Sequence, residues 1–135
     1  MSLHLSETYD GKQDHIRNLS LPEIEVFQNI YSDRSYNIKL SFPEFTAICP
    51  KTGLPDFGII NIEYSPNQHC LELKSLKEYF FAYRNVGIFH ENVVNKICED
   101  TTKACLPHWL EVNATYNVRG GITTTVSTSY KAIQK

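Results

Sequence analysis

The sequence lacks the features by which several large classes of protein are recognised. Its six glycines contain no G-x-G-x-x-G, which excludes a Rossmann site as the means of holding a dinucleotide. No apolar run approaches the roughly 20 residues that a helix needs to cross a bilayer. The first residues also lack the charged-then-apolar order of an export signal. We therefore expect a protein of the cytoplasm.

Neither sign of charge is in large excess. Thirteen Lys and Arg residues face 15 Asp and Glu residues, so the formal net charge is -2. A chain without a basic field is a poor direct partner for nucleic acid. The 135 residues, 41% of them hydrophobic, are enough for one core. We predict one domain over residues 35–135, preceded by a polar arm over residues 1–34 with a helical turn around Ile24, Phe27 and Ile30.

The four cysteines form no disulfide or metal pattern. They stand at positions 49, 70, 98 and 105, and a reducing compartment with an ordinary core gives no need for disulfides. Cys105 and His108 form a Cys-x-x-His, but no second pair with ligand spacing accompanies them. We therefore predict four free thiols and no metal site.

The spacing of apolar residues predicts four strands and two helices. Period-two alternation marks strands near residues 36–42, 60–64, 110–118 and 122–130, and helical spacing marks residues 76–84 and 91–105. The order is β-β-α-α-β-β. This order predicts an α+β fold with one antiparallel four-stranded sheet and both helices on one face. Its long edge strands predict pairing with neighbouring subunits around a ring, with sites between subunits.

One loop holds the residues most suited to chemistry. Cys49 lies seven positions before Asp56, across a stretch with Pro50, Gly53 and Pro55. A thiol near a carboxylic acid is the minimum set for attack on an electrophilic carbon with proton delivery to the neighbouring atom. From the residues alone, a buried structural thiol beside a turn aspartate is an equally good interpretation.

Three separated blocks carry a resemblance to a known family. They are Cys49–Asp56 (CPKTGLPD), Glu72–Lys77 (ELKSLK) and Phe89–Asn92 (FHEN). In this order and spacing the chain, from about Tyr36 to Tyr130, resembles the NADPH-dependent 7-cyano-7-deazaguanine reductases of queuosine biosynthesis, in their short single-domain form. One departure is Glu78, which stands where the second block usually continues with Leu or Tyr.

The resemblance implies a fold and an activity. The fold is the tunnelling fold, like that of GTP cyclohydrolase I, in which single or stacked rings of subunits close a barrel. The activity is reduction of the nitrile of a free 7-deazapurine base to an aminomethyl group with two NADPH, which gives a precursor of a modified tRNA base. Two alternatives remain, an amidinotransferase-type relative acting on the same nitrile and a non-catalytic purine-binding ring protein.

The resemblance also implies roles for catalytic and substrate-binding residues. Cys49 would add to the nitrile carbon to form a thioimide, and Asp56, sharing one proton with the thiol, would protonate the nitrogen. His90 would contact the substrate and assist proton transfer. Glu91 would accept hydrogen bonds from the ring N–H and the exocyclic amine. The remaining implied substrate contacts are Leu71, Glu72 and Leu73.

For NADPH, the resemblance implies a phosphate clamp in the second block. Lys74, Ser75 and Lys77 offer two cations and a hydroxyl beside backbone N–H groups at a helix start. Arg119 and Gly120 in the last hairpin turn would add a guanidinium and a close backbone approach. From spacing alone, a solvated basic helix end explains these lysines better.

Overall fold

The structure is a computed structural model that describes residues 11–133. In chain order its elements are β1 (Val26–Gln28), β2 (Ile38–Ile48), β3 (Pro55–Ser65), β4 (His69–Leu71), α1 (Leu73–Phe81), the 3-10 helix η2 (Ala82–Asn85), α2 (His90–Cys105), β5 (Trp109–Tyr116) and β6 (Thr125–Lys131). No helix within this range is long and apolar enough to span a membrane.

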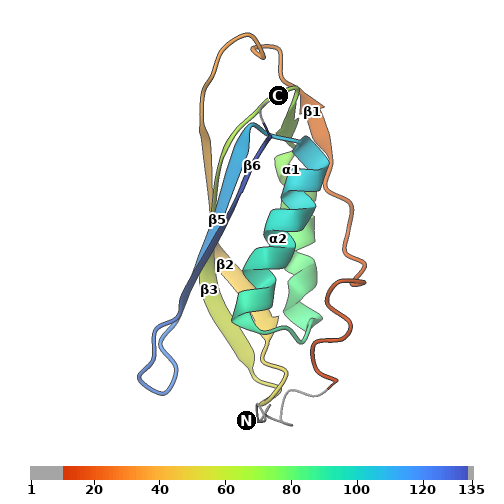
Figure 1. Ribbon diagram of the computed structural model, residues 1–135. Coiled ribbons are helices and arrows are strands. Elements are labelled where there is room, and N and C mark those ends of the chain that lie inside the picture. Colours follow the sequence, from red (N-terminus) through yellow and green to blue (C-terminus); the bar gives the residue numbers. More distant parts are fainter. Residues whose placement is uncertain (1–10, 134–135) are drawn as a thin grey trace, which may run out of the picture.

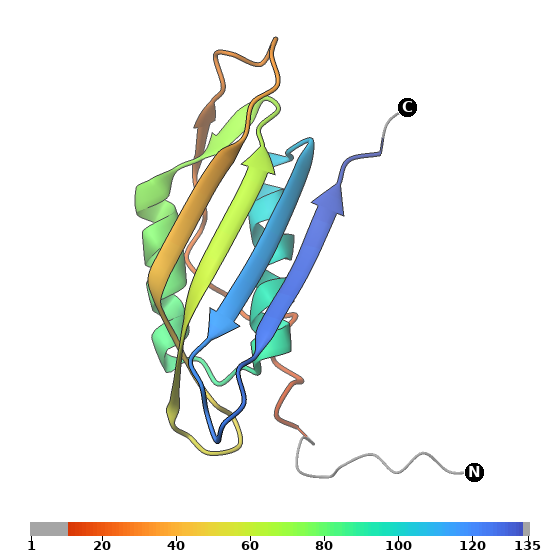
Figure 2. The same cartoon turned by 90° about the vertical axis from the view of Figure 1, so that its left-hand side faces the viewer.

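The main sheet has four antiparallel strands in the order β2-β3-β5-β6. Figure 1 shows α1 and α2 side by side on one face of this sheet, and Figure 2 shows the opposite face without a covering layer. The predicted α+β fold, with both helices on one face, is therefore confirmed. β2 and β6 are the two edges of the sheet.

Alternation along the strands explains the two different faces. Along β5, Leu110, Val112, Ala114 and Tyr116 are buried, and the residues between them are exposed or half-buried. β3 alternates in the same way over most of its length. A fully buried large apolar side chain contributes about 1.5–3 kcal/mol to stability. The face that carries these side chains is therefore the one that the helices cover.

The helices bury the stripes that their spacing predicts. Leu76, Tyr79 and Phe80 of α1 are buried, and Tyr83 continues the stripe into η2. α2 buries Val94, Ile97, Cys98, Thr101 and Cys105, among others. Its C-cap, Leu106, has a left-handed φ of 47° and is followed by Pro107, so the helix ends where proline prevents its continuation.

The predicted helical turn around Ile24, Phe27 and Ile30 is wrong. Residues Val26–Gln28 instead form β1, which pairs antiparallel with β4. Phe27 and Ile30 are 54% and 78% exposed, so the apolar spacing there does not mark a buried helix face. The reason is tertiary, because β4 offers unpaired backbone groups to which this segment hydrogen-bonds.

β2 extends beyond its predicted end. Its pairing with β3 shifts register between Phe42 and Phe45, a β-bulge, and then continues to Ile48. The bulge lets the strand pass Pro43, which cannot donate to a ladder. As a result Cys49 follows directly on a paired strand, and the β2–β3 connection is confined to residues 49–54.

Candidate active site

One cavity of about 550 Å³ collects most of the chemistry-bearing residues. It lies where the β2–β3 loop, the start of α2 and the β5–β6 turn meet, and the N-terminal arm contributes one residue to its wall. Its lining residues are Gln13, Cys49, Lys51, Thr52, Asp56, Phe89, His90, Glu91 and Arg119. The structure therefore brings together Cys49, Asp56, His90, Glu91 and Arg119 of the predicted site.

The loop that carries Cys49 is closed by its own backbone. The Cys49 N–H donates to the carbonyl of Leu54 at 2.9 Å, and the Gly53 N–H donates to the carbonyl of Cys49 at 2.8 Å. Gly53 has a φ of +72°, which glycine adopts without the steric penalty of a side chain. The thiol is thus held at the end of a strand, half-buried at the cavity wall.

The surroundings of Cys49 favour the thiolate. Burial acts to raise the pKa of the thiol, but hydrogen bonds from the Thr52 hydroxyl and from the backbone N–H groups of Thr52 and Lys51 lower it more, so the net pKa lies below the ordinary value. The charge of Asp56 opposes this and is the smallest of these influences. The hydrogen bonds that lower the pKa of the thiol therefore come from the 49–54 loop itself.

Asp56 is a buried carboxylate with two partners. It is 6% exposed, and its Oδ1 accepts a short hydrogen bond from the Arg119 guanidinium. Its Oδ2 lies 3.2 Å from Nε2 of His90. Both carboxylate oxygens are therefore occupied by groups that can donate protons, and His90 connects Asp56 to the start of α2.

His90 is oriented by stacking as well as by Asp56. Its imidazole lies on the ring of Tyr116, with 3.6 Å between ring centroids and 6° between planes. Tyr116 is 2% exposed, and its hydroxyl has no hydrogen-bond partner within residues 11–133. Burial, together with the carboxylates of Asp56 and Glu91, raises the pKa of Tyr116 well above its ordinary value. A neutral ring therefore lies beneath the imidazole.

Glycine opposite Tyr116 makes room for this stack. Gly58 on β3 pairs with Tyr116 on β5. A Cβ at position 58 would lie 3.0 Å from Cδ1 of Tyr116 and 2.9 Å from the carbonyl oxygen of Thr115. The absence of a side chain at Gly58 thus lets the Tyr116 ring lie against the sheet with His90 above it.

The other predicted substrate and cofactor residues do not line this cavity. Leu71, Glu72, Leu73, Lys74, Ser75 and Lys77 belong to β4 and the start of α1. Figure 1 shows this start at one end of the molecule, whereas the β2–β3 loop and the start of α2 lie at the other end. Leu71 is 2% exposed and belongs to the core, and Leu73 is 58% exposed.

The start of α1 is already capped by the chain itself. Glu72 is the N-cap, and its carboxylate accepts from the backbone N–H groups of Lys74 at 2.8 Å and of Ser75 at 2.7 Å. The Ser75 hydroxyl accepts from the Glu25 N–H and donates to the Glu72 carbonyl. The predicted binding of a cofactor phosphate by these N–H groups is therefore wrong, since an internal carboxylate occupies them.

Arg119 and Gly120 lie in a tight turn. Arg119 and Ile122 exchange two backbone hydrogen bonds of 3.0 Å across Gly120 and Gly121, which have φ values of +58° and +82°. Two successive positive φ values are typical of a type I′ hairpin turn. The turn directs Arg119 to Asp56, although 42% of the arginine side chain is still exposed.

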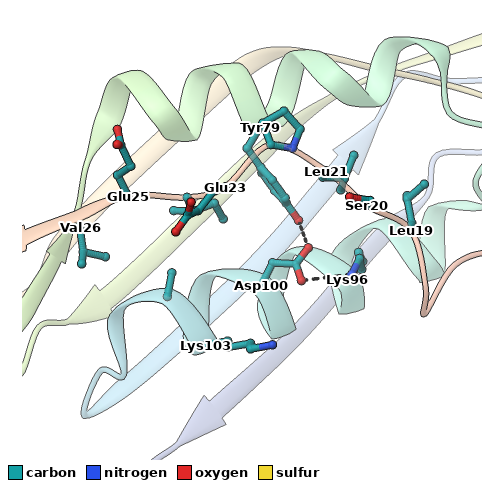
Figure 3. Close-up of a pocket in the computed structure, with 13 residues that line it drawn as sticks. Leu19, Ser20, Leu21, Glu23, Glu25, Val26, Tyr79, Lys96, Asp100 and Lys103 are labelled. Atoms are coloured by element: carbon teal, nitrogen blue, oxygen red, sulfur yellow. Dashed lines mark hydrogen bonds and ion pairs between the residues drawn. The ribbon is translucent and has the colours of Figure 1, made fainter.

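A second cavity, of about 680 Å³, lies beneath the N-terminal arm (Figure 3). Tyr79 donates to Asp100 at 2.6 Å, and Lys96 donates to the other oxygen of the same carboxylate at 3.2 Å. These polar groups pair with one another, and no cysteine lines this cavity. The arrangement is a network that joins α1 to α2.

Sequence reasoning missed several residues of the site. Thr52 lies inside the Cys49–Asp56 block but was given no role, although a hydroxyl three positions after a thiol is a signal for a local hydrogen bond. Tyr116 looks like any inward residue of an alternating strand. Gln13 lies in a polar segment without periodicity, and nothing in the sequence connects it to Cys49.

Fold and site together define a tunnelling-fold protein in which a thiol, a carboxylate and an imidazole share one cavity. The family model described as "QueF-like protein" matches residues 55–135. The structure is similar to that of an archaeosine synthase QueF-Like in its apo form, with a TM-score of 0.63 and 20% identity over 74% of this chain and 96% of that one. This likeness bears on the fold alone.

Similarity to curated proteins is much higher. The chain is 56% identical to the NADPH-dependent 7-cyano-7-deazaguanine reductase of Chlorobaculum tepidum, over 79% of this chain and 92% of that protein. It is 49% identical to the reductase of the same name from Elusimicrobium minutum, over 88% of this chain and 92% of that protein. The chain belongs to this QueF-like family of reductases, which confirms the resemblance found in its three blocks.

Proposed function

We propose that this chain is an NADPH-dependent oxidoreductase that converts the nitrile of 7-cyano-7-deazaguanine to an aminomethyl group, in the route to queuosine. The observation that carries the proposal is the meeting of Cys49, Asp56, His90 and Glu91 in one cavity of a chain that belongs to the reductase family. A reaction that prepares a tRNA base is consistent with a cytoplasmic location, which is part of the proposal.

The first step is covalent capture of the nitrile. The Cys49 thiolate adds to the nitrile carbon, which forms a C–S bond and turns the triple bond to nitrogen into a double bond. The nitrogen takes a proton from the Asp56–His90 pair, whose members lie 3.2 Å apart. The product of this step is a thioimide, in which the carbon accepts hydride far more readily than in the nitrile.

The later steps return the thiol to its starting state. NADPH, when bound, supplies one hydride to the thioimide carbon and a second to the imine that follows. Between these additions the C–S bond breaks, the electron pair returns to the Cys49 sulfur, and the carbon–nitrogen double bond re-forms. A thiol whose pKa is lowered is also a better leaving group. His90 and Asp56 return protons to the nitrogen.

Lys74 and Lys77 are the proposed contacts for NADPH phosphates. Both are exposed cations on α1, which suits an anionic ligand, whereas the hydroxyl of Ser75 is engaged inside the subunit. Arg119 and Gly120 remain proposed contributors from the β5–β6 turn. Since α1 begins at the opposite end of the molecule from Cys49 (Figure 1), the two sets would meet between subunits.

The proposed assembly is a homo-oligomeric ring. β2 and β6 are edge strands with one side unpaired within the described chain, and antiparallel pairing of β6 with β2 of a neighbour would continue the sheet. Leu73 and Lys77 line a cavity of about 240 Å³ beside β2. A neighbour docked along β2 would bring residues of its own to this cavity, and Leu71, Glu72 and Leu73 would approach a substrate held by the adjoining subunit.

The test combines mass spectrometry with cofactor stoichiometry. Incubation with 7-cyano-7-deazaguanine without NADPH should raise the protein mass by one substrate, and Cys49→Ser should abolish the adduct. Cys98→Ser is the matched control, because Cys98 is buried on α2 and does not line the cavity. With NADPH present, two equivalents should be oxidised per nitrile. An adduct that persists in Cys49→Ser, or a ratio of one, would refute the mechanism.

A further inference from the structure

The N-terminal arm reaches the candidate active site. Residues 11–22 have no helix or strand, yet Ile16 is 8% exposed and belongs to the core cluster. His15 Nε2 lies 2.9 Å from the carbonyl oxygen of Gly87, three residues before His90. The arm is thus anchored in the core by Ile16 and beside the segment that carries His90 and Glu91 by His15.

Gln13 is the residue of the arm that enters the cavity. It lines the same wall as Cys49, Asp56 and Glu91. Its Oε1 accepts a hydrogen bond from Nδ2 of Asn92 at 2.7 Å, and Asn92 directly follows Glu91 in the first turn of α2. The carboxamide of Gln13 is therefore tied to the residue next to the proposed base-binding carboxylate.

This bond fixes which end of the carboxamide remains available. Since Oε1 is used by Asn92, the Nε2 group with its two N–H donors is left, and it has no hydrogen-bond partner within residues 11–133. A donor in this position complements Glu91, which offers only acceptors when ionised. Together the two side chains present one acceptor group and one donor group to the cavity.

A deazaguanine has the matching sequence of groups on one edge. Its carbonyl oxygen accepts, and its ring N–H and exocyclic amine donate. Glu91 would accept from the two donors and leave the carbonyl oxygen without a protein partner, so a donor placed beside Glu91 would add a hydrogen bond. We propose that Gln13 is a specificity-determining residue that donates from Nε2 to this carbonyl oxygen. The arm, through Gln13, and α2, through Glu91, would then both hydrogen-bond to the same edge of the base.

The inference rests on the proposed function, because it takes the same base as the ligand. It gives the arm a role in recognition that adenine-type bases would not satisfy. An adenine-type edge presents an amine where the carbonyl would be, so it would place donor against donor at Gln13 and an unprotonated ring nitrogen near Glu91. The arm thus rejects such bases as well as binding the correct one.

The test measures non-covalent binding. In a Cys49→Ala background, which cannot form the adduct, calorimetry gives the dissociation constant of 7-cyano-7-deazaguanine with Gln13, Gln13→Ala and the isosteric Gln13→Glu. Loss of one hydrogen bond should weaken binding about tenfold in Gln13→Ala. Gln13→Glu should weaken it further, because a carboxylate repels the carbonyl oxygen. Arg17→Ala, an exposed arm residue outside the cavity lining, should leave binding unchanged.

A second ligand separates a direct contact from a general disturbance of the arm. The analogue without the carbonyl oxygen should bind the Gln13 and Gln13→Ala proteins equally, although more weakly than the natural base binds. Equal losses for both ligands, or no loss in either variant, would overturn the inference. If the unsubstituted protein neither binds the natural base nor oxidises NADPH with it, the proposed function fails instead, so the two failures are distinguishable.

Discussion

At the scale of single residues, the reactivity of Cys49 is a property of its own loop. The thiol receives hydrogen bonds from a side chain and two backbone groups within three positions, and these outweigh the burial and the negative charge of Asp56. A hydrogen bond to a charged group stabilises it more than a bond between neutral groups. The short β2–β3 connection therefore both positions the sulfur and lowers the pKa of the thiol.

Thr52→Val should make Cys49 less reactive at neutral pH. Loss of the Thr52 hydroxyl removes a hydrogen bond that lowers the pKa of the Cys49 thiol. The pKa therefore rises, and a smaller fraction of Cys49 is thiolate at pH values below the new pKa. The rate of alkylation by iodoacetamide, followed against pH in a protein whose other three cysteines are serine, should fall several-fold at pH 7 and recover at higher pH. Thr125→Val, an exposed site on β6, is the control. An unchanged pH profile would show that Thr52 has no part in activation.

At the scale of elements, the start of α1 shows how one glutamate joins three segments. Glu72 caps α1, its carbonyl accepts from Ser75 Oγ, and its backbone N–H donates to the Glu25 carbonyl of the arm. Glutamate is not among the residues preferred at an N-cap. Glu72 can serve as the N-cap of α1 because its two carboxylate oxygens accept from two successive backbone N–H groups.

Glu72→Gln should lower the thermal stability, and the loss should depend on pH. Hydrogen bonds from the backbone N–H groups of Ser75 and Lys74 hold the pKa of Glu72 below its ordinary value. A carboxyl group whose pKa is lower in the folded than in the unfolded state stabilises the fold at pH values above its unfolded-state pKa. This stabilisation is lost as the pH falls through the folded-state pKa. The melting temperatures of the two proteins should therefore differ by a few degrees at pH 7 and converge as the pH falls through the folded-state pKa of Glu72.

Glu78→Gln is the matched control for this experiment, because Glu78 is exposed on the same helix. A difference in melting temperature that does not change between pH 7 and pH 3 would contradict the capping role. If Glu72→Gln also raised the Michaelis constant for the base at a temperature where the protein is fully folded, Glu72 would contact the substrate in addition to capping α1.

At the scale of the whole molecule, the proposed reaction draws on groups at both ends of the subunit. The β2–β3 loop, which begins with Cys49, and the start of α1, which carries Lys74, lie at opposite ends of the subunit (Figure 1). Nine residues of α-helix already span about 13 Å. We propose that the base and the phosphate contacts of one site come from different subunits.

Mixed oligomers should test this division. Cys49→Ala and the double variant Lys74→Ala, Lys77→Ala should each be slow alone at low NADPH concentration. Co-expressed in equal amounts with different tags, and purified through both, they should recover about a quarter of the unsubstituted rate, because random pairing leaves that share of shared sites intact. No recovery of activity in oligomers that contain both variants would show that Cys49 and the two lysines act within one subunit.

The elements were predictable because their cause is local. Alternation along residues 110–116 and the aromatic stripe from Leu76 to Tyr83 are set by which side chains must leave water, and the structure has both. The predicted alternation does not continue to Val118, which is exposed. The β1 segment was not predictable, since three residues become a strand only where β4 accepts them. Likewise Gln13 reaches the cavity through contacts with Ile16, Gly87 and Asn92 that no sequence pattern connects.

By itself the sequence determined the order of the two α-helices and of the four strands of the main sheet, the side of that sheet that is buried and the identity of the nucleophile candidate, since each depends on residue type and near-neighbour spacing. Only the tertiary structure decided that Arg119 binds Asp56 and that Tyr116 lies beneath His90. These pairs are separated by as many as 63 positions. Their contacts exist because the folded sheet and helices bring those backbones together, which spacing along the chain does not encode.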